Sequence, residues 1–491
     1  MAGRYAPQKH PNIRSLIRLL GRSVSVELRT PPQSREVSMK DRLLYPGTLL
    51  VLAATATLLP PFPCYVLCFL LLLWLVSGGR WRFARPSGLP FKAGTRDQSN
   101  LLAALAEGVR PIDWGICLFI AMMLVSGVVG TFFSDYAQSF PVVTRVSLNL
   151  VLKLGLTWLV LSGAMIVLVR RGFTPGRVAP WLAAWLAVHF VYCLAQRATG
   201  VDWVHGFHAV LEGNRFAYGV YRVSGFMSHP LTLGYNLVLT VLAAAAMLFR
   251  TGTMLLRRER WAWGAVLVLA LLTLLISGSR FVLVVLVVTL AVCEGRRALC
   301  YKWWLAGGAA LTAVILWLEG SMIGRYRELF NQKVPLTQRF HRLEYWRLHA
   351  QMFLDHPMFG VTLAGRQPAA IAYYTAAGNH DNLYIAHNIF LQILADSGLL
   401  GFFGLVAFFI GLTMAARRLC RHAGQGISYL IVATLVSGLM QNNLRDSGYL
   451  YALWFYLGLL LVQSASLAAR PAGLEVNERE SSKNLESGAG A

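Results

Sequence analysis

AHNIFLQILADSGLLG occupies residues 386–401, and the apolar character of the chain continues to residue 413. His387 and Asn388 thus open a segment that is long and apolar enough to cross a lipid bilayer as a helix. An ionisable side chain at the boundary between water and membrane is costly to desolvate, so it indicates a functional site. The alternative is an interfacial histidine that merely caps the helix.

Composition assigns the whole chain to the membrane. Hydrophobic residues make up 56% of the 491 residues and charged residues only 14%, which is not the balance of a soluble protein. Apolar segments of about 17 to 23 residues recur, each long enough to span the hydrocarbon core as a helix. We predict an all-α polytopic membrane protein with 12 transmembrane helices at 43–60, 62–78, 111–133, 146–169, 178–196, 231–249, 261–277, 281–293, 303–319, 388–413, 427–441 and 449–467.

Basic residues are distributed unevenly among the loops. Most of the 45 lysines and arginines lie in the N-terminal segment, the tail and every second loop, and basic loops are retained in the cytoplasm. Because the number of helices is even, both termini are predicted to be cytoplasmic, and the other face looks outward, into the periplasm if the host is a Gram-negative bacterium. The expected parts are a basic cytoplasmic N-terminus (1–42), transmembrane helices one to nine (43–319), a large helical periplasmic loop (320–387), transmembrane helices ten to twelve (388–467) and a disordered cytoplasmic tail (468–491).

The net charge of +23 does not indicate nucleic-acid binding, because the surplus lies mainly in short loops beside the spans. The predicted periplasmic loops contain none of the seven cysteines, so disulfides are not expected. The sequence shows no metal-ligand spacing, and we expect neither a metal nor another cofactor.

The predicted loop 320–387 is basic although it lies on the outer side, so its excess charge is available for binding anions. Helical spacing over 337–354 places one set of apolar residues on a single face and the arginines elsewhere on the surface. The apolar set is Phe340, Leu343, Trp346, Ala350 and Phe353, and the arginines are Arg339, Arg342 and Arg347. Two interpretations of this predicted helix remain open: a solvated amphipathic cap over the bundle, or a helix that binds anions.

Two further arginines are predicted at membrane level on the outer side. Arg222 precedes the sixth span, and Arg280 ends the short turn between the seventh and eighth spans. A guanidinium is always charged and can donate two hydrogen bonds to one phosphate group, so a convergent pair would suit a diphosphate. Either arginine alone could instead be an interfacial anchor.

Five segments carry a resemblance to a known family. They are Arg222 to Phe226, Ser277 to Arg280, Arg342 to Trp346 with Arg347 after it, His356 to Gly360, and His387 to Gly401. Their order and loop positions resemble the O-antigen ligase and polymerase superfamily of bacterial membrane glycosyltransferases. The resemblance is strong over about 220–405 and rests elsewhere on helix count alone.

The resemblance implies metal-independent transfer of a glycan from undecaprenyl diphosphate to an acceptor sugar hydroxyl at the periplasmic face. His387 would be the catalytic base, which works best with a pKa near the ambient pH. Arg222 and Arg280 would bind the diphosphate and stabilise the charge that develops on it. His380 remains an alternative base, and possible secondary residues are Arg215, Asn388, Arg339, Arg342 and Arg347.

The favoured function is ligation of O-antigen polysaccharide to a core sugar of lipid A, because a basic outer loop suits an acceptor rich in phosphate. An O-antigen or exopolysaccharide polymerase and a protein O-oligosaccharyltransferase remain alternatives within the enzyme class. A lipid or glycan transporter is the alternative outside it, although the sequence shows no paired broken helices in two halves. His229 is expected to be a turn residue, and no chemistry is assigned to the outward loop 442–447.

Overall fold

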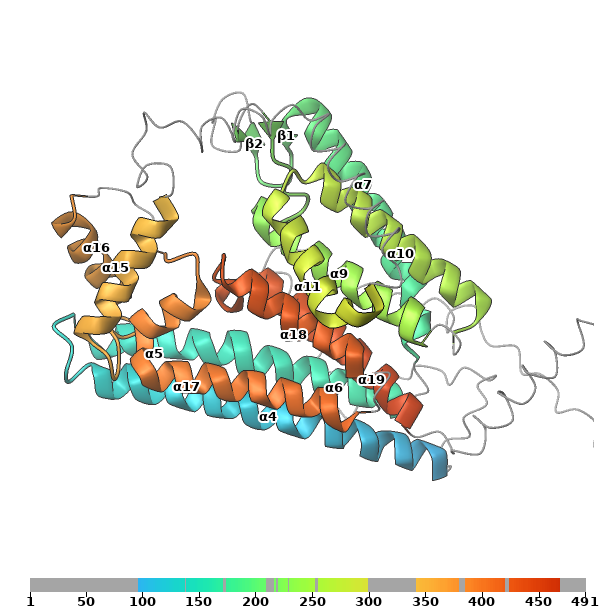
Figure 1. Ribbon diagram of the computed structural model, residues 1–491, viewed down its shortest axis with the longest axis horizontal. Coiled ribbons are helices and arrows are strands. Elements are labelled where there is room, and N and C mark those ends of the chain that lie inside the picture. Colours follow the sequence, from blue (N-terminus) through green and yellow to red (C-terminus); the bar gives the residue numbers. More distant parts are fainter. Residues whose placement is uncertain are drawn as a thin grey trace, which may run out of the picture.

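The computed structural model describes residues 96–136, 138–170, 174–208, 216–217, 220–227, 229–251, 255–298, 341–378, 385–419 and 424–468. These residues are mostly helical (Figure 1). The α-helices are α4 (Arg96–Gly130), α5 (Phe140–Leu150), α6 (Thr157–Arg170), α7 (Ala179–Thr199), α9 (Pro230–Thr251), α10 (Arg257–Ile276), α11 (Arg280–Ala298), α15 (His341–Asp355), α16 (Arg366–Ala376), α17 (Ile389–Arg418), α18 (Gly424–Gly438) and α19 (Ser447–Ala468).

Shorter elements connect these helices. A π-helical segment, η1 (Val151–Leu156), joins α5 to α6, and the 3-10 turns η2 (Pro175–Arg177) and η5 (Asn443–Arg445) precede α7 and α19. Two antiparallel hairpins, each of two-residue strands, follow α7: β1 (Val201–Asp202) with β2 (Phe207–His208), and β3 (Phe216–Ala217) with β4 (Val220–Tyr221).

Seven helical segments among the described residues are long and apolar enough to cross a membrane, and the shorter apolar helices Phe281–Gly295 and Gly426–Gly438 accompany them. Together they coincide with nine of the predicted spans. The other three, 43–60, 62–78 and 303–319, lie outside the described residues, as do the N-terminal segment 1–42 and the tail after residue 468. The prediction of an all-α polytopic membrane protein is confirmed.

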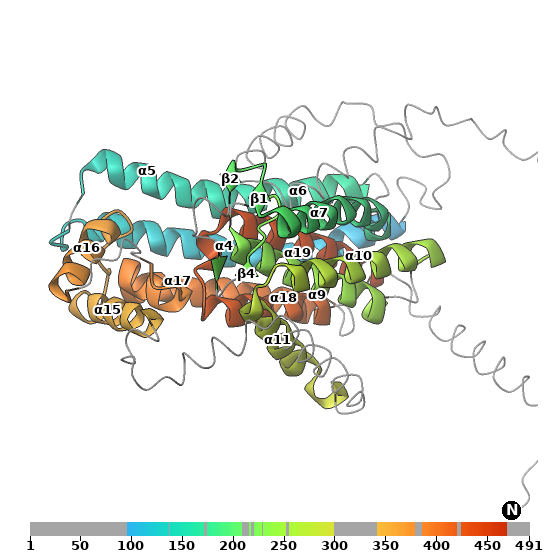
Figure 2. The ribbon, with the colours of Figure 1, turned by 90° about the horizontal axis from the view of Figure 1, so that it is seen from above.

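The long helices run along one another with alternating direction (Figures 1 and 2). The end of α4, the start of α5 and the helices α15 and α16 lie at one end of the bundle, which we call the loop end. α4 begins and α17 ends at the opposite end. His387 directly precedes α17 and therefore lies at the loop end.

α4 and α17 lie side by side over most of their length (Figures 1 and 2). Glycines allow this close approach. A Cβ atom added to Gly115 would lie 3.0 Å from the carbonyl oxygen of Ala407, and one added to Gly404 would lie 3.1 Å from Cα of Phe119. Small residues commonly line helix contacts in membranes, because lipid provides no hydrophobic force that drives helices together.

α9 and α19 form the most buried part of the bundle. Polar groups join them: the hydroxyls of Thr240 and Tyr456 lie 2.7 Å apart, and the Asn236 amide donates to the Gly448 carbonyl at 3.2 Å. Such pairing is needed because an unsatisfied polar group is costly in an apolar interior. These contacts fix the start of α19 beside the start of α9.

The described part of the predicted loop domain contains α15 and α16. They pack through Tyr345 and Tyr374, whose ring centroids lie 5.6 Å apart. α15 ends at Asp355, immediately before His356-Pro357, as the sequence predicted. The buried side of α15 does not coincide with the predicted apolar face: Leu343 is 53% exposed, whereas the buried side chains are Tyr345, Leu348, His349 and Met352.

Candidate active site

A break in α17 shapes the loop end. Gly398 has φ 61° and ψ −160°, which interrupts the helix, and backbone groups at such a break need other partners. The turn His356–Gly360 and Val361 supply them. Three backbone hydrogen bonds join the segments: Leu399 N–H to Pro357 O at 2.8 Å, Leu400 N–H to Met358 O at 3.3 Å, and Val361 N–H to Ala395 O at 2.9 Å.

Two glycines make this junction possible. Gly360 has φ 64° and Gly398 φ 61°, a region that side chains with a Cβ atom rarely adopt. A Cβ on Gly360 would lie 2.5 Å from the Ala395 carbonyl oxygen, and one on Gly398 would overlap the Met358 carbonyl. From α4, the Ser126 hydroxyl lies 2.9 Å from the carbonyl oxygen of Phe359 and 3.0 Å from that of Ser397.

His387 lies one residue before the N-cap of α17, with a left-handed backbone of φ 50°. This conformation is uncommon for residues other than glycine and must be held by its surroundings. The Asn388 side chain accepts hydrogen bonds from the backbone N–H groups of Phe390 at 3.0 Å and Leu391 at 3.2 Å. On the other side, Ala386 N–H donates to Gln392 Oε1 at 3.0 Å. Both neighbours of His387 are therefore fixed.

The His387 ring has a defined tautomer. Its Nδ1 lies 3.0 Å from Oε1 of Gln441, and because an amide oxygen only accepts, Nδ1 carries the proton and Nε2 has a free lone pair. Burial, together with the nearby charge of Arg342, lowers the pKa of His387, although the hydrogen bond to Gln441 opposes this. A neutral imidazole with an available nitrogen is the form that can accept a proton.

A charged pair supports the residues around His387. Arg445 Nη1 donates to Oδ2 of Asp396 at 2.6 Å, and Oδ1 of Asp396 accepts from Gln392 Nε2 at 2.9 Å. Burial lowers the pKa of Arg445 to about 10, so the guanidinium stays charged at neutral pH. The network thus runs from Arg445 through Asp396 and Gln392 to the backbone of Ala386, next to His387.

Two more arginines make the surroundings of His387 positive. Arg342, in the first turn of α15, places Nη1 4.0 Å from the sulfur of Met440 and acts on the pKa of His387. Arg366, the first residue of α16, contributes to lowering the pKa of Arg445. Asp396 is already paired with Arg445. The loop end therefore offers positive charge to an anionic ligand.

Residues 265–406 match the family model described as O-antigen ligase. The match covers less than a third of the chain, and it shows that this segment is similar to the O-antigen ligase family. The segment contains the Arg280 turn, α15, the His356–Gly360 turn and His387 through Gly401, so the resemblance predicted from these segments is confirmed at the level of the superfamily. The family consists of membrane proteins that join or polymerise lipid-linked glycans, which supports a glycan-transferring role in O-antigen assembly. A search of curated proteins gives no match.

Arg222 lies outside the residues that match the O-antigen ligase family, in a segment held against α7. Ser224 donates to Oδ2 of Asp202 at 3.1 Å. Gly225, with φ 58°, donates its N–H to Gln196 Oε1 at 2.8 Å. Phe226 stacks on Tyr192 with ring centroids 4.5 Å apart. The Ser-Gly-Phe part therefore anchors the segment, and Arg222, which is partly exposed, lies between this part and strand β4.

Arg280 begins α11 directly after the turn of Ser277 to Ser279, as predicted; its side chain lies outside the described residues. The Ser279 hydroxyl donates to the Pro230 carbonyl at 3.3 Å, which ties this turn to the start of α9. The Arg222 segment leads into the same end of α9. Backbone positions of both arginines therefore flank one helix end.

The loop after α18 connects α9 to the His387 network. Thr232, in the first turn of α9, donates a short hydrogen bond to Oδ2 of Asp446. Oδ1 of Asp446 accepts the N–H groups of Gly448 at 3.0 Å and Tyr449 at 3.3 Å, and so caps α19. The adjacent Arg445 pairs with Asp396. The sequence assigned no role to this loop, because its partners are distant in the chain. The available signal was the polar run 441–447 between two apolar spans, which includes one arginine and one aspartate.

The remaining predicted site residues either lie apart from the His387 network or are not among the residues that the structure describes. Arg347 is exposed on α15. His229 uses Nδ1 to accept the N–H of Leu231 at 3.1 Å, so it serves at the turn into α9, as predicted. Arg215, Arg339 and His380 lie outside the described residues. Among the described residues, no three His, Cys, Asp or Glu side chains gather as metal ligands.

Proposed function

We propose that the protein is an O-antigen ligase. It transfers polysaccharide from undecaprenyl diphosphate to a sugar hydroxyl of lipid A-core at the periplasmic face of the bacterial inner membrane, with both termini in the cytoplasm. The observation that carries the proposal is His387, held in a left-handed backbone and fixed as one tautomer at the head of α17, within the segment that matches the O-antigen ligase family model. A site at this end suits a lipid-linked donor, because its diphosphate lies at the membrane surface.

His387 acts as the base in this proposal. Its Nε2 accepts the proton of the acceptor hydroxyl as oxygen attacks the first sugar of the donor and the bond to diphosphate breaks. The lowered pKa keeps the imidazole neutral at physiological pH, which is the state needed to take a proton. Gln441 keeps Nε2 in the acceptor form. Asn388 is a positioning residue, because its side chain caps α17 rather than facing the ring.

Arg222 and Arg280 bind the diphosphate in this proposal. Their guanidinium groups neutralise the charge that grows on the leaving oxygen, and fixed donors are effective because they need no reorganisation during the reaction. Arg342 is the most suitable secondary phosphate ligand, since its charge already acts on His387. The proposed reaction uses no metal.

The polymerase is the second candidate, because the matched family model supports O-antigen assembly without separating polymerases from ligases. The basic residues Arg342 and Arg366 near His387 favour the ligase, since lipid A-core carries more phosphate than a second lipid-linked repeat. A protein O-oligosaccharyltransferase would need a peptide acceptor, and a transporter would need no base.

The test is a deletion strain of the native host, complemented with the wild-type gene or with His387→Ala. The ligase proposal expects bare lipopolysaccharide core together with long polymer on undecaprenyl diphosphate, both corrected only by the wild-type gene. Core bearing a single repeat would identify a polymerase instead. Unchanged lipopolysaccharide would refute both and direct attention to exopolysaccharide or glycoprotein acceptors.

A further inference from the structure

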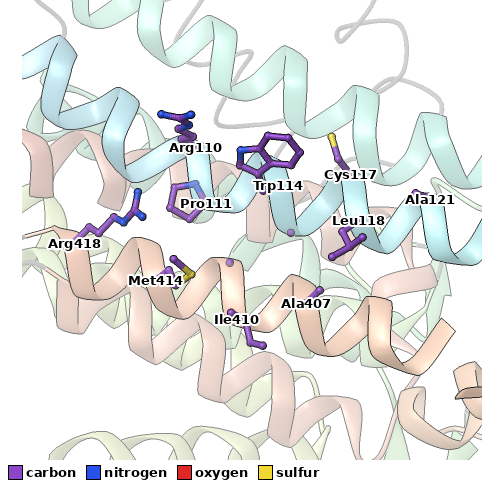
Figure 3. Close-up of a pocket in the computed structure, with 12 residues that line it drawn as sticks. Arg110, Pro111, Trp114, Cys117, Leu118, Ala121, Ala407, Ile410, Met414 and Arg418 are labelled. Carbon is purple, nitrogen blue, oxygen red and sulfur yellow. The ribbon is translucent and has the colours of Figure 1, made fainter. Parts of the chain in front are cut away.

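A groove of about 900 Å³ lies between α4 and α17, on the outside of the part of the bundle that the structure describes (Figure 3). Its sides are apolar and include Trp114 and Leu118 from α4 and Ile410 and Met414 from α17. Trp114 is 68% exposed. In a protein that spans a membrane, such a surface faces lipid chains rather than water.

Small residues create the groove. Gly115, Ala121, Ala407 and Gly411 line it, and a Cβ atom on Gly411 would overlap the carbonyl of Pro111. The two backbones therefore touch at the floor, while the larger side chains stand on either side. A channel of this kind accommodates an extended acyl chain, and it does not lead through the bundle because the helices are in contact beneath it.

Two arginines close one end of the groove. Arg110 from α4 and Arg418 from α17 lie at the same end in Figure 3. Neither guanidinium has an acidic partner among the residues that the structure describes, and Glu107, one turn from Arg110, forms no ion pair with it there. Two unpaired guanidinium groups beside an apolar channel match a ligand with a phosphate at one end and a hydrocarbon chain behind it.

The depth of these arginines identifies the leaflet. At a rise of 1.5 Å per residue, Arg110 lies about 30 Å along α4 from Gly130, which is the thickness of the hydrocarbon core. Gly130 lies at the loop end, where a Cβ atom added to it would lie 2.8 Å from Cγ2 of Thr362 and 3.2 Å from Cβ of Phe359. The arginines therefore lie at the membrane surface opposite to His387, so a lipid held there is distinct from a donor that reacts at His387.

We propose that this groove binds an anionic glycerophospholipid from the leaflet opposite to His387. The headgroup phosphate lies between Arg110 and Arg418, and one acyl chain follows the floor between α4 and α17. This lipid is not consumed; it fills the seam between the two helices.

Native mass spectrometry of the purified, delipidated full chain, titrated with phosphatidylglycerol, tests the proposal. We expect one tightly retained phosphatidylglycerol and much weaker retention of phosphatidylcholine. An arginine at a membrane surface changes the affinity for an anionic lipid about fivefold, so Arg110→Gln with Arg418→Gln should weaken binding about 25-fold. The matched control is Arg258→Gln, which removes an exposed arginine at the same end of the bundle but outside the groove and should leave binding within about twofold.

A second variant separates a lipid site from a phosphate site. Ala121→Phe keeps both arginines and fills the apolar channel, so it should also weaken retention of phosphatidylglycerol. Equal losses in the double variant and in Arg258→Gln would overturn the proposal, since they would reflect general charge. Unchanged binding in the double variant would overturn it as well. Displacement by inorganic phosphate, with no effect of Ala121→Phe, would show a site for free phosphate instead.

Discussion

At the scale of single residues, His387 combines two uncommon properties. Its backbone is left-handed, which costs of the order of 1–3 kcal/mol for a residue with a side chain, and its ring is partly buried beside a positive charge. The surrounding hydrogen bonds, in which the side-chain oxygens of Asn388, Gln392 and Gln441 are the acceptors, offset this cost. A strained backbone conformation that is held in place by three neighbouring residues is typical of a functional position. A residue that only caps a helix would not need it.

Replacement of His387 by alanine should lower glycan transfer by at least about 10²-fold, because the proposed reaction loses its base. Transfer from a lipid-linked donor to purified lipopolysaccharide core measures this. Insertion into the membrane should be unchanged by immunoblot of the membrane fraction. His229→Asn, which keeps a cap for α9, is the control and should retain activity; wild-type turnover by His387→Ala would remove His387 from the mechanism.

The hydrogen bond from His387 to Gln441 predicts a specific pH response. Because burial lowers the pKa of His387, the acid limb of kcat/KM should have its midpoint below pH 6.5, the ordinary histidine value. Gln441 raises this pKa, so Gln441→Leu should move the acid limb to lower pH. It should also reduce the plateau about tenfold, because the tautomer is no longer fixed. An acid limb that moves upward would contradict this account.

Arg445 and Asp396 should respond unequally to substitution. Asp396 is 1% exposed and Arg445 32% exposed. Arg445→Ala leaves the buried carboxylate of Asp396 without its cation and should lower the free energy of unfolding by about 3–5 kcal/mol. Asp396→Ala should lower it by less, because the remaining arginine can reach water. The melting temperatures of the two variants, measured by thermal unfolding in detergent, show which substitution is more destabilising. A double variant as unstable as the sum of both would indicate that the two residues act independently.

At the scale of elements, the break in α17 explains two segments that the sequence marked separately. The His356–Gly360 turn and the Gly398 region are distant in the chain, yet each supplies the backbone partners that the other lacks. The first turns of α17, which carry Asn388, Gln392 and Asp396, are therefore positioned by the turn after α15 as much as by their own helix.

Gly398→Ala should destabilise the protein by more than about 2 kcal/mol, because alanine disfavours a positive φ and its Cβ would overlap the Met358 carbonyl. Activity should fall with it, since the head of α17 loses its support. The matched control is Gly127→Ala on α4, where an added Cβ meets no atom within 4 Å. That change should stabilise the helix by about 0.5–1 kcal/mol. Equal melting temperatures for both variants would refute the proposed role of the break.

The face of α15 shows where helical spacing fails. The predicted apolar face includes Leu343 and not His349, but Leu343 is 53% exposed and His349 is fully buried. Its Nδ1 lies 2.9 Å from the Tyr345 carbonyl oxygen one turn earlier, so the helix itself satisfies one ring nitrogen and makes the burial affordable. A pattern based on apolar residues alone cannot include such a side chain.

At the scale of the whole molecule, the spans were predictable because hydropathy and length suffice to recognise them. The candidate site was predictable only in part. His387 was marked by its place at the head of an apolar helix, whereas Gln441, Arg445 and Asp396 acquire their roles through contacts between α17 and the loop before α19. Hydrogen bonds between segments about 50 residues apart leave no periodic pattern in a sequence.

The proposed orientation makes a prediction for the entire bundle. In a cysteine-free background, Ser139→Cys in the α4–α5 connection should react with a membrane-impermeant maleimide added to spheroplasts, because the loop end would face the periplasm. Arg258→Cys at the start of α10 should react only after the membrane is opened. Both positions are exposed in the structure. The reverse labelling pattern would place His387 in the cytoplasm and exclude the proposed ligase.

The backbone junction between the turn after α15 and the interrupted α17 also bears on substrate range. α15 cannot move away from the head of α17 as a hinged unit unless three main-chain hydrogen bonds break, so the distance between Arg342 and His387 should be the same with and without bound glycan. The outward side chains of α15 and α16 take no part in this junction. Substitutions at those positions should therefore leave the reactive histidine in place, which would let related proteins differ in the sugars they accept.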